Sequence, residues 1–172
     1  MKTDITYLEN SDIYREVVIE GILKAQNHVF IATANVKDMF VESGKDFISI
    51  VKHFKELCKR GVEIRILHST TPSRPFLGEI KSARMSRTQN FMMRQCVRCH
   101  LKAVIIDGEK VFLGSANLSG AGLGAKRENR RNFESGIMSS DTALVDKAAS
   151  FFKMIWNGSF CQDCGRKANC KK

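Results

Sequence analysis

Five polar residues near the middle of the chain carry groups that suit chemistry on a phosphate ester: His100, Lys102, Ser115, Asn117 and Glu134. An imidazole can act as a nucleophile or as a general acid and base near neutral pH. Ammonium, hydroxyl and amide groups can hold the non-bridging oxygens of a phosphate while negative charge develops on them. Metal ions often do this work in other sites, so these residue types favour phosphoryl chemistry without a metal.

The stretch from His100 to Asn117 predicts a β-hairpin that gathers the polar groups. Asp107-Gly108 separates two apolar runs rich in β-branched residues, which is a strong signal for a tight turn. Side chains two residues apart on a strand share a face. A two-residue loop sets His100 opposite Ser115, and a four-residue loop sets it opposite Asn117. Either register collects the groups on one surface, whereas an odd loop or a bulge would not.

The order and spacing of these residues resemble the signature motif of the phospholipase D superfamily. The motif reads His100-x-Lys102, four residues, Asp107, and then Gly114-Ser115-x-Asn117. Downstream, Asn132-Phe133-Glu134 resembles the trailing Asn-x-Glu element of the same family. The resemblance implies an α/β fold, with a mixed sheet flanked by helices and one half of the catalytic motif pair in each chain. The family includes phospholipases, phosphatidyl transferases, nucleases and repair enzymes, so the motif indicates the reaction rather than the substrate.

The resemblance also implies a role for each residue. His100 supplies the nucleophile and the acid or base, Lys102 and Asn117 bind phosphate oxygens, Ser115 assists, and Glu134 orients His100. The family's site contains two histidines: one forms a phosphohistidine, and the other protonates the leaving oxygen and then activates water. One motif copy therefore predicts a symmetric homodimer, as in the small bacterial single-motif endonucleases of the family. At the turn tip, Asp107 is expected to have a structural role.

The remaining chain predicts alternating helices and strands, which favours an α/β sheet with parallel pairs. The predicted helices cover residues 12–26, 44–60 and 141–156, and the predicted strands cover 28–34, 62–68 and 133–138. The segment 69–95 is predicted to be an irregular helix plus a loop. We assign residues 1–158 to one catalytic domain and 159–172 to a Cys-rich tail. His28, His53 and His68 are expected to be packing or surface residues, with His68 nearest to the site.

Basic residues exceed acidic residues by 28 to 18, which gives a net charge of +10. This charge favours a polyanionic partner, with nucleic acid ahead of an anionic membrane surface. Two basic clusters precede and follow the hairpin and are predicted to bind substrate. The first contains Arg84, Arg87 and Arg94, with Arg98 behind it, and the second contains Lys126, Arg127, Arg130 and Arg131.

Two Cys-x-x-Cys pairs predict a structural zinc site with four thiolates, and no cofactor is expected for catalysis. The pairs are Cys96 with Cys99 and Cys161 with Cys164, and Cys170 is an alternative ligand. Such a site would hold the tail against the domain. An iron–sulfur cluster, free thiols and disulfides are the alternatives left open.

Taken together, the sequence predicts a metal-independent phosphodiesterase, most specifically an endonuclease acting on DNA or RNA through a phosphohistidine. The alternatives are a phospholipase or phosphatidyl transferase, and a catalytically silent nucleic-acid-binding module. The chain has neither a charged-then-apolar N-terminal segment nor an apolar run of membrane-spanning length, which predicts a cytoplasmic protein.

Overall fold

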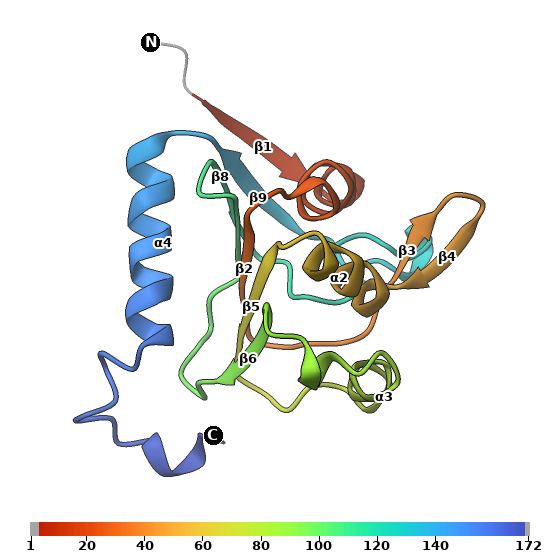
Figure 1. The fold of residues 1–172 in the computed structure, drawn as a ribbon. Helices are drawn as coiled ribbons and strands as arrows, with labels where there is room; N and C mark the ends of the chain where they lie inside the picture. The colour runs from red at the N-terminus through yellow and green to blue at the C-terminus, as the bar shows by residue number, and fades with distance from the viewer. Residues whose placement is uncertain (1–3, 171–172) are drawn as a thin grey trace.

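Seven strands form one mixed sheet in a computed structural model that describes residues 4–170 (Figure 1). The strand order is β1-β9-β8-β7-β2-β5-β6. Strands β2, β5 and β6 run parallel, and every other neighbouring pair is antiparallel. The predicted fold class is confirmed. The strands of the sheet are β1 (Ile5–Glu9), β2 (His28–Thr33), β5 (Glu63–His68), β6 (Phe91–Gln95), β7 (Ala103–Ile106), β8 (Lys110–Gly114) and β9 (Ser135–Ser139).

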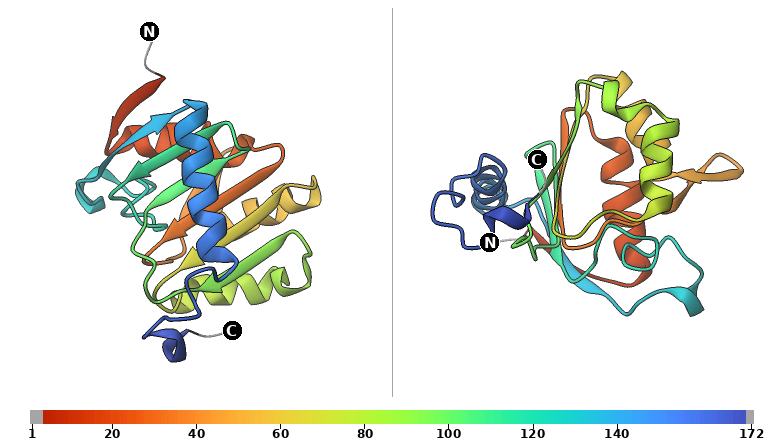
Figure 2. Two further views of the ribbon diagram at one scale, coloured as in Figure 1. Left: turned by 90° about the vertical axis from the view of Figure 1, so that its left-hand side faces the viewer. Right: turned by 90° about the horizontal axis from the view of Figure 1, so that it is seen from below.

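Helices cover both faces of the sheet, unequally (Figure 2). One face carries the first helical segment, made of α1 (Ser11–Ile13), η1 (Tyr14–Ile19) and η2 (Ile22–Lys24), together with α2 (Ile50–Lys59) and α3 (Arg74–Ser82). The other face carries α4 (Thr142–Trp156) alone. Short 3-10 turns follow elsewhere in the chain: η3 (Met85–Arg87), η4 (Glu128–Arg130) and η5 (Lys167–Asn169).

The alternation of side chains along β2 explains the two-sided packing. Val29 and Ile31 belong to the larger core, under the first helical segment, α2 and α3. Phe30 belongs to the smaller core, under α4. Phe30 stacks on Phe152 of α4 with ring centroids 5.1 Å apart. Because both faces of β2 are buried, residues 29–32 between its polar ends are all apolar, as expected for a central strand with a parallel neighbour.

A hairpin replaces the first part of the predicted helix 44–60. Strands β3 (Phe40–Ser43) and β4 (Asp46–Ser49) pair antiparallel, and α2 begins only at Ile50. The Ser49 hydroxyl accepts a hydrogen bond from the Val51 N–H at 3.2 Å and caps the helix. Apolar residues in 47–48 extend the helical stripe by coincidence, and a short apolar run does not distinguish helix from strand.

Two strands of the seven-stranded sheet were not predicted either. β1 pairs with β9 along its whole length and forms one edge of the sheet, and β6 forms the opposite edge from within the segment expected to be irregular. The other predicted strands and the last helix lie close to their expected bounds. The Asp141 carboxylate caps α4 by accepting the Leu144 N–H at 2.8 Å.

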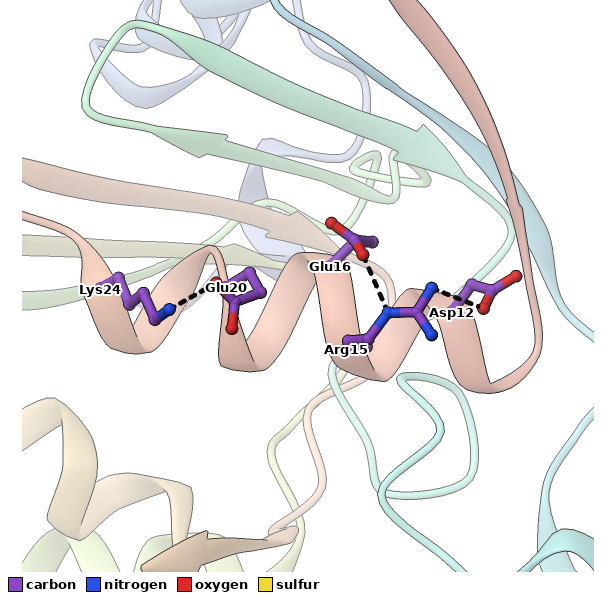
Figure 3. A network of polar contacts seen from close by, with 5 residues as sticks. All are labelled: Asp12, Arg15, Glu16, Glu20 and Lys24. Atoms are coloured by element: carbon purple, nitrogen blue, oxygen red, sulfur yellow. Dashed lines mark hydrogen bonds and ion pairs between the residues drawn. The ribbon is translucent and has the colours of Figure 1, made fainter.

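The first helical segment begins after Asn10 and has no side-chain cap. Its outer surface carries ion pairs instead (Figure 3). Arg15 lies 3.0 Å from Asp12 and 2.9 Å from Glu16, and the segment ends with the Lys24–Glu20 pair. All five side chains are exposed, so these pairs contribute little to stability.

Candidate active site

The motif residues lie along the edge of the sheet that is formed by strand ends, at the point where β2 ends and β7 begins. Ala32 near the end of β2 pairs with Ala103 at the start of β7. His100 and Lys102 lie in the segment that enters β7, and Ser115 and Asn117 lie just beyond β8. The carbonyl of Lys102 accepts the Gly114 N–H at 3.1 Å, which is the last ladder bond before the two segments separate.

The hairpin register differs from both predicted registers. Ile106 pairs with Lys110, so the loop contains three residues, an odd number. Asp107 and Gly108 both have positive φ, at 56° and 72°, and the Glu109 N–H donates to the Ile106 carbonyl at 3.0 Å. This is a tight turn followed by one extra residue. The predicted face-sharing by alternation is therefore wrong. The motif residues reach one edge because they directly precede β7 and directly follow β8, and these two strands are antiparallel.

His100 and Lys102 form one contact pair on the surface. The Lys102 Nζ lies 3.2 Å from each ring nitrogen of His100 and donates to the His100 carbonyl oxygen at 3.0 Å. The imidazole is exposed, so it is available to a substrate or to another chain. This pair places an imidazole and an ammonium group side by side.

Ser115 and Glu134 form a second polar pair. The Ser115 hydroxyl donates to Glu134 Oε2, and Asn132 Nδ2 donates to Glu134 Oε1 at 3.0 Å. The Ser135 N–H donates back to Ser115 Oγ at 3.1 Å. Within residues 4–170, Glu134 makes no hydrogen bond to His100, so the orienting role implied by the family resemblance stays a prediction.

Two glycines allow this second pair to form. Gly114 of β8 lies opposite Gly136 of β9. A Cβ added to Gly114 would lie 2.6 Å from the Ser135 carbonyl oxygen and 3.0 Å from the Gly136 Cα. Larger residues here would force the strands apart and separate Ser115 from Glu134.

Asn117 fixes the loop that follows β2. Its Oδ1 accepts hydrogen bonds from the Ala34 N–H and the Asn35 N–H, both at 3.1 Å, and lies 3.2 Å from Thr33 Oγ1. The amide nitrogen is the end that the described residues leave for a phosphate oxygen. Asn117 therefore has a positioning role beyond the phosphate binding that the resemblance implies.

Thr33 was not singled out from the sequence, yet it joins the two sides of the site. It is only 1% exposed. Its backbone N–H donates to the Cys99 thiol beside His100, and its hydroxyl accepts the Leu118 N–H at 3.0 Å. A polar residue at the end of an otherwise apolar strand is the sequence signal that marks it.

Only one of the two predicted basic clusters lies beside the site. The Asn132 N–H donates to the Ala121 carbonyl at 3.1 Å and closes the downstream loop, which leads directly to Glu134. The loop that carries Lys126, Arg127, Arg130 and Arg131 therefore begins and ends beside the motif residues. Arg84 and Arg87 precede β6 and lie at its opposite end, one strand length away. This separation corrects the expectation that both clusters flank the hairpin.

Arg94 is occupied elsewhere. Its guanidinium lies over the Trp156 ring at 5.1 Å and donates to the Trp156 carbonyl oxygen. This contact connects β6 to the end of α4, on the face of the sheet that α4 covers. Arg94 therefore has a structural partner, and its predicted substrate contact is not supported by its position.

Asp107 has a structural role, as predicted, although its partners lie outside its own turn. Its carboxylate accepts the N–H groups of Gln26, Asn27 and His28 at 2.7–2.9 Å. Burial alone would raise the pKa of Asp107, but these three donors outweigh burial and hold the pKa below its usual value. The carboxylate thus locks the hairpin turn to the start of β2.

The other histidines pack against the fold. His28 lies 4.4 Å from the Phe30 ring, His53 contacts the Val41 carbonyl, and His68 Nδ1 lies 2.9 Å from the Thr70 carbonyl. His68 pairs with Thr33 across the sheet and is the nearest of the three to the site. Burial lowers the pKa of each of these imidazoles.

The predicted thiolate ligands do not meet at one point. Among residues 4–170, no group of three or more His, Cys, Asp and Glu side chains is arranged to hold a metal ion. Cys96, Cys99, Cys161, Cys164 and Cys170 are all free. Cys58, expected in the core, is buried in α2, and burial raises the pKa of its thiol to about 11.

Comparison with known sequences connects this geometry to a family. The family described as "Cardiolipin synthase, PLD-like domain" matches residues 18–156, which include every motif position. The chain belongs to the phospholipase D superfamily. Among curated protein sequences, none matches this superfamily member significantly.

Solved structures share the phospholipase D fold of this chain. NucT from Helicobacter pylori is 21% identical with a TM-score of 0.65, over 91% of this chain and 97% of NucT. Nuc from Salmonella typhimurium, a phospholipase D family member, is 17% identical with a TM-score of 0.62, over 89% and 95% of the two chains. TrmBL2, an archaeal chromatin protein with a novel mode of DNA binding, is 17% identical with a TM-score of 0.54, over 90% of this chain and 52% of TrmBL2.

At identities of 17–21%, the similarity to these solved structures shows that this phospholipase D superfamily member shares their fold. In the portion of the chain that the structure describes, every helix is too short or too polar to cross a bilayer.

Proposed function

We propose that this chain is a metal-independent phosphodiesterase that cleaves nucleic acid as a homodimer. The observation that carries the proposal is the exposed His100–Lys102 pair, which lies at the same sheet edge as Ser115, Glu134 and Asn117. A nucleophile, a cation and neutral donors on one edge match the needs of in-line attack on a phosphodiester.

In the first proposed step, His100 of one copy attacks phosphorus. A P–N bond forms, the P–O bond to the leaving sugar oxygen breaks, and the partner subunit's His100 donates a proton to that oxygen. In the second step, the partner's His100 removes a proton from water as the water attacks phosphorus. The P–N bond then breaks and both imidazoles return to their starting states. Lys102 and the Asn117 amide nitrogen stabilise the charge on the non-bridging oxygens.

A single chain supplies only one imidazole suited to this reaction. Among residues 4–170, the other three histidines contact backbone carbonyls or aromatic rings and lie within packed parts of the fold. A second copy related by a twofold axis would supply the missing acid, because a symmetric interface presents the same patch from both chains. The exposure of His100 supports this arrangement.

The charge distribution supports a nucleic-acid substrate. The net charge is +10, and the loop beside the site contributes four exposed or half-exposed basic residues. Lys and Arg that follow a phosphate backbone provide affinity without reading sequence. The DNA binding described for TrmBL2 also agrees with this partner class.

The test is a cleavage assay with single- and double-stranded DNA and RNA in the presence of a chelator. The wild-type protein should cut at least one of these substrates, and His100→Ala should abolish turnover. His53→Ala is the matched control, because His53 lies on α2 and contacts the Val41 carbonyl away from the motif. Persistent cleavage by the His100→Ala protein would contradict the mechanism.

A lipid substrate is the second candidate. Phe40 and Phe47 lie on the same face of the β3–β4 hairpin and are 58% and 63% exposed, which gives the apolar surface that membrane contact requires. Met39, just before β3, lies near Gly120 at the start of the basic loop. Hydrolysis of anionic phospholipid vesicles faster than of nucleic acid would establish this candidate. Binding without turnover of any substrate, including bis(p-nitrophenyl) phosphate, would indicate a silent binding module.

A further inference from the structure

One apolar cavity is lined by all five cysteines other than Cys58. It has a volume of about 750 Å³ and lies between β6, the segment before His100, the end of α4 and the tail. Its thiols come from two distant parts of the sequence. Cys96 and Cys99 precede His100, and Cys161, Cys164 and Cys170 belong to the tail.

The two Cys-x-x-Cys segments adopt the same local geometry. In each, the N–H of the second cysteine donates to the carbonyl of the first, at 2.8 Å for Cys99 to Cys96 and 3.5 Å for Cys164 to Cys161. In each, the second sulfur also accepts the N–H of the residue two positions later, which is Leu101 for Cys99. The two turns therefore share the same backbone hydrogen bond between their cysteines.

The tail pair repeats this pattern and adds a charged donor. The Cys164 sulfur accepts the Arg166 N–H and a hydrogen bond from the Arg98 guanidinium. Arg98 also faces Cys96 and Cys161, so one cation lies among thiols from both segments.

The cations around the cavity suit an anionic metal centre. Four thiolates around one Zn²⁺ leave a charge of −2, which needs compensation in an apolar setting. Arg94, Arg98 and Lys167 line the same cavity. Hydrogen bonds from such outer groups to ligating atoms orient the ligands of metal sites and tune their affinity.

We propose that the two Cys-x-x-Cys turns are the halves of a four-thiolate zinc site that closes when the tail turn moves onto the turn before His100. The ligands are Cys96, Cys99, Cys161 and Cys164. Four thiols lose their protons as the metal binds. The sulfurs line one cavity without meeting at one point among the described residues, so closure requires movement of the tail. Most tail residues are exposed, so little packed core opposes that movement.

The proposed metal would stabilise the segment that carries His100. Cys99 is adjacent to His100 and is 3% exposed, and its sulfur accepts the Thr33 N–H at the end of β2. A metal on Cys99 would therefore connect the tail to the strand edge that carries the motif. The metal itself takes no part in the phosphodiester reaction.

The experiment is Co²⁺ and Zn²⁺ titration of the full, reduced chain after removal of metal. One Co²⁺ per chain should produce the sulfur-to-cobalt charge-transfer and intense visible absorption typical of tetrahedral thiolate sites, and Zn²⁺ should displace it with release of protons. Cys161→Ser should weaken metal affinity by more than the roughly 10–100-fold that follows loss of an outer partner. Arg98→Ala should fall within that smaller range.

Two controls make the test decisive. Cys58→Ala removes a buried thiol from α2, and Cys170→Ser removes the fifth cavity thiol; both should leave the spectrum and stoichiometry unchanged. Cys161 is exposed, so its substitution leaves the core intact, and thermal unfolding verifies this for each variant. Three results would overturn the proposal: no thiolate spectrum, a spectrum that survives Cys161→Ser, or purified protein containing an iron–sulfur chromophore or a disulfide between the two pairs.

Discussion

The hydroxyl of Ser115 donates a hydrogen bond to the carboxylate of Glu134, across the junction where β8 ends and β9 begins. The bond joins the signature motif to the trailing Asn-x-Glu element, 19 residues later. Asn132 completes the arrangement from the end of the basic loop. The two parts of the motif therefore act as one unit in this fold.

Because Ser115 and Glu134 bind each other, their substitutions should not be additive. We expect Ser115→Ala and Glu134→Gln each to lower kcat/KM by up to about 100-fold, since each frees its partner to move. The kcat/KM of the double variant should be only slightly lower than that of the less active single variant. Steady-state kinetics on all four proteins measures the coupling. Multiplicative losses would show that the two residues act independently.

Two substitutions of Asn117 should separate positioning from phosphate binding. Asn117→Ala leaves the Ala34 and Asn35 N–H groups without their acceptor, and we expect a loss of about 1–3 kcal/mol in the free energy of unfolding. Asn117→Asp keeps an acceptor for both and should preserve most of that stability. It should nevertheless lower activity, because a carboxylate repels the phosphate. Denaturant unfolding and kinetics, compared for both variants, test this distinction.

The basic loop should matter more than an equal charge elsewhere. Arg127→Gln with Arg130→Gln should weaken nucleic-acid binding and make the slope of log affinity against log salt less steep, because fewer counterions are released. Lys81→Gln with Arg87→Gln removes the same charge before β6 and should change binding much less. Fluorescence anisotropy at several salt concentrations provides the comparison. Equal effects would indicate that only net charge determines binding.

Acidification should destabilise the fold through its packed histidines. Burial lowers the pKa of His28, His53 and His68 in the folded chain, so the unfolded chain takes up protons at higher pH than the folded chain does. Their stabilising contribution is complete above the ordinary histidine pKa of about 6.5 and declines as the pH falls through that value. The Tm should therefore fall between about pH 7 and pH 5.

His68→Gln should reduce this pH dependence of the Tm. Lys59→Gln, an exposed change that does not titrate in the range, should leave the dependence intact. A Tm that stays flat or rises on acidification of the wild-type protein would contradict the assignment.

Mixing experiments should reveal whether two copies share one site. If each dimer uses both His100 side chains, a mixed dimer of wild-type and His100→Ala chains is inactive. Activity should then fall with the square of the wild-type fraction after subunits exchange. A linear decrease would show that each chain acts alone. Size determination in solution on the same samples checks that the chains are dimers.

The sequence alone carried the local features of this protein. Two apolar runs around Asp107-Gly108 predict the hairpin, the apolar stretch 28–34 predicts a buried strand, and Asp141 predicts the start of α4; the structure contains all three. The sequence alone also indicated the superfamily, because its motif depends on residue types at fixed spacing in one short segment. These properties depend on neighbours in the chain, and so the sequence displays them directly.

Contacts between distant segments were decided only by the tertiary structure. The extra residue in the Asp107 turn shifted the register, which two-residue alternation could not reveal. The pairing of Glu134 with Ser115 and the distance of Arg84 and Arg87 from the motif depend on strand order in the sheet. Strand order depends on the packing of both sheet faces and on loop closure over long separations. Neither is encoded at any single position, so only the folded chain shows which polar groups meet.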